Sequence, residues 1–236
     1  MSDQLDLRGR GLSVVPDEVW QAEGLRSLAL GRNPLGAIPE TIGSLTSLTA
    51  LYLDQTGIEE LPGAVGRLQG LRVLDIAHNR LAALPADVAR LGSLEVLYLG
   101  DNRFAALPEP VRSLRSLLYL GAADNRIEAL PDWIGALEAL VELYLRGNQL
   151  AVLPEAMADL RALRSLDLRE TGIAALPEWL ATLPALQRLD LRRNGFLDPP
   201  PVVDRLRARG CVVWLDHSAA RTSLAARSPE RTAPSM

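Results

Sequence analysis

The stretch LRVLDIAHNRLAALPADVARLGS, residues 71–93, is one complete copy of a pattern that runs along nearly the whole chain. Apolar residues fill its places 1, 4, 6, 11, 14, 18 and 21, with asparagine at place 9 and proline at place 15. Place 1 recurs every 23 residues, at Leu25, Leu48, Leu71, Leu94, Leu117, Leu140, Leu163 and Leu186. A fixed period of this length indicates a solenoid whose repeats contact only their neighbours.

Each repeat predicts one strand, one bend and one turn or short helix. Alternation at places 4 to 6 predicts a strand with its leucines inward and place 5 outward. The proline ends the extended run and starts a turn or short helix, whose places 18 and 21 return to the core. We expect the asparagine amides to bond the backbone at the bend and to stack into a ladder. Thr56 and Thr171 replace asparagine in two repeats.

The core L-x-x-L-x-L-x-x-N-x-L, followed by x-x-L-P-x-x-[VIL]-x-x-L, resembles the leucine-rich-repeat family. The 23-residue length and the Leu-Pro pair are similar to the Ras-suppressor, Scribble and plant Ras-group class. The resemblance implies an α/β solenoid, or horseshoe. It would have a parallel concave sheet of about ten short strands, with short helices or turns on the convex side. It also implies protein partners in signalling.

The pattern divides the chain into four predicted parts. Residues 1–24 are a degenerate N-terminal capping repeat, and residues 25–208 are the eight full repeats. Residues 209–217 are predicted to be a C-terminal closing strand, with Trp214 pointing inward as a place-6 residue. Residues 218–236 lack apolar periodicity and are predicted to be a disordered tail.

Composition and charge limit the class of protein. The net charge of −4 argues against nucleic-acid binding, which needs a basic stripe. All 25 basic residues are arginine, which indicates either codon bias in a GC-rich bacterial genome or a protein that escapes lysine modification in a host cell. The single cysteine fits a reducing compartment. No apolar run has the length of a signal peptide or a membrane span. We therefore expect a cytoplasmic monomer without a membrane partner, or alternatively a secreted effector.

The sequence predicts no catalytic, cofactor or metal site. His78 and His217 are far apart, and Cys211 is the only cysteine, so no zinc-ligand spacing exists. Phosphate-binding glycine loops are absent as well. Cys211 is expected next to an inward Val212, as a small residue of the closing strand rather than a reactive thiol.

The outward places of the predicted sheet supply the candidate binding surface. All four tyrosines of the chain lie there, and tyrosine both favours strands and anchors interfaces. The candidate partner-binding residues are Tyr52, Asp75, Tyr98, Tyr119, Gly121, Tyr144, Arg146, Asp167, Arg169, Asp190 and Arg192. Trp133 and Trp179 share place 17 and form a possible second patch on the convex side, unless each ring only covers its neighbours.

Two further features of this surface, its charge distribution and a group of small residues, lead to predictions. Acidic residues dominate its first half and arginines enter its second half, which would orient a docked partner. Part of this charge is expected to form ion pairs, such as Asp167 with Arg146 or Arg188. Small residues in LLYLGAADNRI (117–127) predict a dip with a tyrosine rim, open above Gly121. Ala122 thins the core beneath it, where Phe104 would fill the space.

These observations predict a non-catalytic scaffold or adaptor that binds a protein partner through the concave sheet. The alternative is a secreted bacterial effector, or a substrate-recruiting subunit whose catalytic domain lies on another chain.

Overall fold

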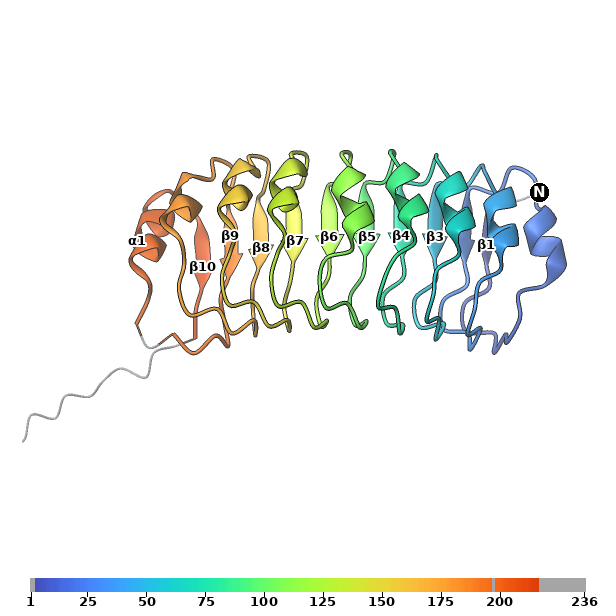
Figure 1. Cartoon of the computed structure of the whole chain (residues 1–236), viewed down its shortest axis with the longest axis horizontal. Coiled ribbons are helices and arrows are strands. Elements are labelled where there is room, and N and C mark those ends of the chain that lie inside the picture. The colour runs from blue at the N-terminus through green and yellow to red at the C-terminus, as the bar shows by residue number, and fades with distance from the viewer. Residues whose placement is uncertain (1–2, 197, 217–236) are drawn as a thin grey trace, which may run out of the picture.

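The computed structural model describes residues 3–196 and 198–216, so His217 and the predicted tail lie outside the described residues. Ten strands form one parallel sheet in which each strand pairs with the next one along the chain. The strands are β1 (Gln4–Asp6), β2 (Ser27–Ala29), β3 (Ala50–Tyr52), β4 (Val73–Asp75), β5 (Val96–Tyr98), β6 (Tyr119–Gly121), β7 (Glu142–Tyr144), β8 (Ser165–Asp167), β9 (Arg188–Asp190) and β10 (Val212–Trp214). The predicted α/β solenoid is confirmed (Figure 1).

One helix per repeat lies across from the sheet, as Figure 1 shows along the length of the solenoid. Eight of these are 3₁₀ helices of five residues, each following a proline with extended backbone dihedrals. They are η1 (Asp17–Gln21), η2 (Glu40–Ser44), η3 (Gly63–Arg67), η4 (Ala86–Arg90), η5 (Glu109–Ser113), η6 (Asp132–Ala136), η7 (Glu155–Asp159) and η8 (Glu178–Thr182). The ninth is the α-helix α1 (Pro201–Ala208), which precedes β10. Proline has no N–H, so it ends the extended run and starts a helix without losing a bond.

The strands cover places 3 to 5 of each repeat rather than the expected places 4 to 6. Place 6 is still buried, and its N–H still donates to the next repeat, as from Ile76 to the Tyr98 carbonyl at 3.1 Å. Places 4 and 6 therefore face the core and places 3, 5 and 7 face outward. We call the surface formed by these outward places the concave face, and the side of the 3₁₀ helices the convex side.

The core is a continuous column of buried leucines from repeat to repeat. Ala122 and Phe104 are both buried in it, and Phe104 is the largest fully buried side chain. Because a single repeat has too little apolar surface to offset its chain entropy, stacking is the source of stability.

The asparagine ladder forms as predicted. Asn125 accepts the Phe104 N–H at 3.0 Å and donates to the carbonyls of Leu99, Ala122 and Ala123 at 3.0–3.2 Å. Thr56 donates its hydroxyl to the Leu53 carbonyl and to the amide oxygen of Asn79 in the next repeat. Threonine thus keeps part of the network.

Place 8 has a left-handed backbone in every full repeat, with φ between 51° and 70°. It turns the chain immediately before the ladder asparagine. The residues at place 8 are Arg32, Gln55, His78, Asp101, Asp124, Gly147, Glu170 and Arg193. Four of these eight, Arg32, Gln55, Glu170 and Arg193, are of residue types that rarely adopt this conformation, so the stacking of repeats imposes it.

Candidate concave binding face

The place-5 residues are direct register partners across the sheet. Tyr52 pairs with Asp75, and Asp75 pairs with Tyr98. The same column continues through Gly121, Tyr144, Asp167 and Asp190. A parallel sheet without a slip holds these side chains about 4.8 Å apart. The candidate residues from places 3, 5 and 7 therefore belong to one surface.

Three tyrosines form a connected aromatic cluster in the middle of this face. The ring centroids of Tyr98 and Tyr119 are 4.8 Å apart, and those of Tyr119 and Tyr144 are 5.2 Å apart. The Tyr144 hydroxyl donates to Glu142 at 2.7 Å. Each ring is half-buried, so flat aromatic area remains available to a partner.

A hollow of about 300 Å³ lies among these rings. It is lined by the three clustered tyrosines together with Ala77, His78, Gly100, Asp101, Gly121, Ala123, Asp124, Arg146, Asp167 and Arg169. Apolar rings and a polar edge thus line the same hollow.

The predicted dip with a tyrosine rim is present, but the expectation that it has room for a side chain on Gly121 is wrong. Gly121 is buried, and a Cβ built on it would lie 3.0 Å from a ring carbon of Tyr119 and 3.2 Å from its hydroxyl. Tyr119 stands two residues earlier on the same strand, and its ring lies over the glycine. The Tyr119 ring therefore fills the space that a side chain on residue 121 would need, although Gly121 still lines the hollow.

Burial changes the ionisation of these phenols. It is the main cause that raises the pKa of Tyr98, Tyr119 and Tyr144 above the ordinary value, and most strongly that of Tyr119. Neighbouring carboxylates raise these pKa values further, including Asp75 near Tyr98 and Glu142 near Tyr144. The hydroxyls therefore stay protonated and able to donate hydrogen bonds at neutral pH.

The arginines of the second half are held by carboxylates, but Asp167 does not pair with Arg146 or Arg188 as expected. It binds Arg169 on its own strand at 2.5 Å, because places 5 and 7 lie on the same side of the chain. Arg146 instead reaches Asp124 at 2.6 Å.

Asp190 closes this network at the C-terminal end of the face. It binds Arg192 at 2.6 Å and lies 3.4 Å from Arg169. Burial alone would raise the pKa of Asp190, but the hydrogen bonds and positive charges of these arginines lower it below its ordinary value. The arginine half of the face is therefore largely neutralised.

The closing strand differs from its prediction by one residue. Val212 and Trp214 are exposed and Val213 is buried, so Trp214 points outward as the register partner of Asp190. Two adjacent valines made the alternation ambiguous, and no further repeat fixed it. Trp214 therefore extends the concave face. Cys211 is buried and burial raises the pKa of its thiol, which keeps it in the unreactive protonated form.

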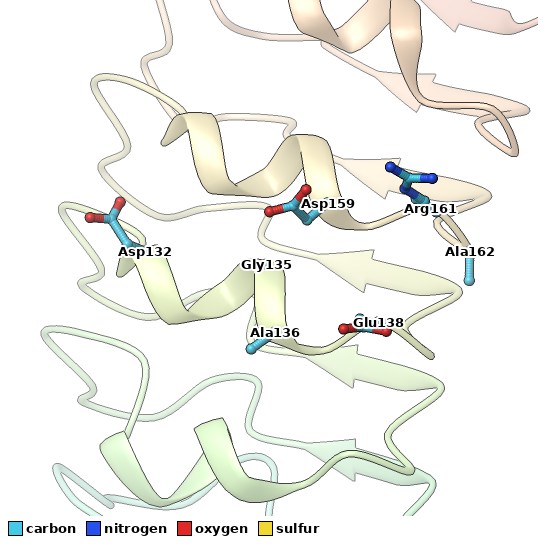
Figure 2. Close-up of a pocket in the computed structure, with 7 residues that line it drawn as sticks. All are labelled: Asp132, Gly135, Ala136, Glu138, Asp159, Arg161 and Ala162. Atoms are coloured by element: carbon cyan, nitrogen blue, oxygen red, sulfur yellow. The ribbon is translucent and has the colours of Figure 1, made fainter.

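The convex tryptophans pack against the core. Trp133 and Trp179 are half-buried, and the Trp133 indole N–H donates to Glu109 of η5 at 2.8 Å. The broad hollow between η6 and η7, shown in Figure 2, is lined by neither ring. Its charged lining residues are Asp132, Glu138, Asp159 and Arg161. This hollow therefore has no aromatic anchor of the kind that dominates interfaces.

Among the described residues, no group of three or more His, Cys, Asp or Glu side chains is placed to hold a metal ion. Within the same residues, no helix is both long and apolar enough to cross a bilayer.

The repeat, the parallel sheet and the asparagine ladder together define a leucine-rich-repeat solenoid. The chain belongs to the leucine-rich-repeat family: the family model described as a leucine-rich repeat region matches residues 5–100 and, in an overlapping match, residues 40–123. A sequence comparison with curated proteins gives no match.

Solved structures with the same fold come from bacteria and plants. A leucine-rich-repeat protein of Leptospira interrogans is 26% identical with a TM-score of 0.71, and the match covers 89% of this chain and 64% of that one. The ectodomain of the Arabidopsis thaliana receptor kinase GASSHO1/SCHENGEN3, in complex with Casparian strip integrity factor 2, is 27% identical with a TM-score of 0.65. That match covers 80% of this chain and 27% of the receptor chain. Internalin C2 of Listeria monocytogenes shares the fold at 22% identity, with a TM-score of 0.65 and coverage of 90% and 80%. The chain thus spans less than two thirds of the Leptospira and Arabidopsis chains.

Proposed function

We propose that the protein is a non-catalytic scaffold or adaptor that binds a protein partner through its concave face. The observation that supports this proposal most directly is the cluster of Tyr98, Tyr119 and Tyr144 around a hollow of about 300 Å³. Aromatic residues with a polar tip anchor interfaces, because they bury a large flat area with little loss of conformational entropy. The peptide complex of the Arabidopsis ectodomain supports the use of this fold for protein ligands.

The proposal extends to the cellular location of the protein and to its oligomeric state. We place the protein in the cytoplasm, as a monomer in a signalling pathway, and its one cysteine being reduced and buried supports a reducing compartment. The acidic net charge supports a protein partner over a nucleic acid.

The proposal predicts that Tyr98→Ala and Tyr144→Ala each weaken partner binding by about 1–3 kcal/mol, as truncation of an interface anchor does. The partner is captured from a lysate of the source organism with the wild-type protein, and its affinity for each variant is then measured by calorimetry. Thermal unfolding should change little, since each ring contact contributes only about 0.5–1.5 kcal/mol to stability.

Trp133→Ala and Trp179→Ala serve as controls on the convex side and should bind the partner normally. If both tyrosine variants keep full affinity while a tryptophan variant loses it, the binding face is the convex one and the proposal fails.

A further inference from the structure

The column Tyr52, Asp75 and Tyr98 differs from the rest of the concave face. Its middle carboxylate is half-buried between two tyrosines, and within the described part of the chain it accepts one hydrogen bond, from the Ala77 N–H at 3.0 Å. Asp54, at place 7 of the preceding repeat, lies against Gly31, where its carboxylate occupies the space that a Cβ would need. Neither aspartate forms an ion pair within residues 3–196 and 198–216.

The cations nearest to these carboxylates do not neutralise them. Arg8 binds Asp6 at 2.7 Å, and His78 binds Asp101 at 2.8 Å. The Arg32 N–H donates to the Asp54 carbonyl, but its side chain pairs with neither carboxylate. Arg146, Arg169 and Arg192 farther along the face are paired with carboxylates, whereas Arg8 and His78 act on Asp54 and Asp75 only at longer range, without an ion pair.

The negative charge of Asp75 reduces stability. Burial raises the pKa of Asp75 and repulsion from Asp54 adds to it, and together these outweigh the Ala77 hydrogen bond and the His78 charge, which lower it. The folded pKa is thus above the unfolded one, so Asp75 destabilises the fold when ionised, and this penalty is removed as the pH falls through the folded pKa. An incoming cation would remove the same penalty at neutral pH.

We infer that the slot formed by Tyr52, Asp75 and Tyr98, with Asp54 beside it, binds an arginine side chain on an extended segment of the protein partner. The two tyrosines stand two strands apart, about 10 Å at the backbone, with Asp75 on the strand between them. Tyrosine is longer than aspartate, so the carboxylate lies at the bottom of the slot. A guanidinium fits because it stacks on aromatic faces and donates in a planar fork to a carboxylate.

This inference rests on the proposed function and names the chemistry of the partner. The neighbouring hollow beside Tyr98 would then receive an apolar side chain of the same segment. An acidic slot at one end and paired arginines at the other would fix the direction of the segment.

The test is a selection of random linear dodecapeptides displayed on phage against the wild-type protein. We expect the selected peptides to be enriched in arginine at one position. A synthetic selected peptide should bind the double variant Asp54→Asn, Asp75→Asn at least tenfold more weakly than wild type. Replacing its arginine by the neutral isostere citrulline should weaken binding to wild type by a similar factor, with little further loss on the double variant.

Glu170→Gln is the matched control, because it removes one negative charge from the same side of the sheet outside both the slot and the hollow, and glutamine already adopts the left-handed backbone of place 8 at Gln55. It should leave the peptide affinity unchanged. The double variant should melt no lower than wild type, since it removes unpaired charges, so a loss of binding cannot be ascribed to unfolding. Peptides that lack arginine, or that bind the double variant as tightly as wild type, would overturn this inference and leave the proposed function intact. A selection that yields no binding peptide would overturn it too, whether or not the lysate partner is found.

Discussion

Asn125→Ala is expected to lower the free energy of unfolding by about 3 kcal/mol, because it leaves several buried groups unpaired at about 1–3 kcal/mol each. Asn125 is 7% exposed. It accepts the Phe104 N–H and donates to three carbonyls from its own and the preceding repeat. An alanine side chain makes none of these bonds. Urea unfolding followed by circular dichroism measures the loss.

Two variants test the cause. Asn125→Thr should lose less stability than Asn125→Ala, because Thr56 and Thr171 show that a hydroxyl at this place still donates to a carbonyl three residues earlier. Arg126→Ala changes the exposed neighbour and should change stability by less than about 0.5 kcal/mol. Equal losses for Asn125→Ala and Asn125→Thr would show that the ladder bonds do not set the stability of the bend.

Gly135→Val is expected to lower the free energy of unfolding by about 3 kcal/mol, the upper end of the usual range for overpacking. Gly135 lies in η6, and a Cβ built on it would overlap the carbonyl oxygen of Ala156 and lie 3.0 Å from the carbonyl carbon. These are backbone atoms of the next repeat, so they cannot move aside as a flexible side chain can. The two neighbouring repeats would have to move apart along the axis of the solenoid.

Gly92→Val provides the matched control. Gly92 is exposed after η4, and a Cβ built on it meets nothing within 4 Å. Its variant should unfold close to wild type in the same thermal and chemical scans. If Gly135→Val and Gly92→Val have the same free energy of unfolding, then close packing between η6 and the next repeat is not the reason for glycine in η6.

The sequence was enough to predict the main features of the fold: the order of repeats, the inward leucines, the helices that start at proline, and the asparagine ladder. The reason is the 23-residue period: every apolar place repeats eight times in register, so each copy supports the interpretation of the others. The period also placed Tyr98, Tyr119 and Tyr144 on one face, because successive side chains of a strand alternate between the two faces of the sheet.

The prediction was wrong where the period stops. Beyond Pro200 no further copy fixed the register, and either Val212 or Val213 could have taken the inward place. Pairing with β9 decided it, and Trp214 moved from the core to the concave face. The left-handed backbone at place 8 was missed for another reason: residues such as Arg32 and Glu170 give no local signal for it.

The sequence by itself thus determined which way each side chain of a repeat points, and the tertiary structure decided what the outward side chains touch. The ring of Tyr119 lies over Gly121 because the place-5 side chain there is absent and the flanking places hold tyrosines. Asp167 binds Arg169 on its own strand rather than an arginine of the next, and Asp75 is left without a cation. An inward side chain has one packed position, which a pattern can encode. An outward side chain chooses among rotamers according to neighbours 23 residues away on either side, and only the assembled sheet brings those neighbours together.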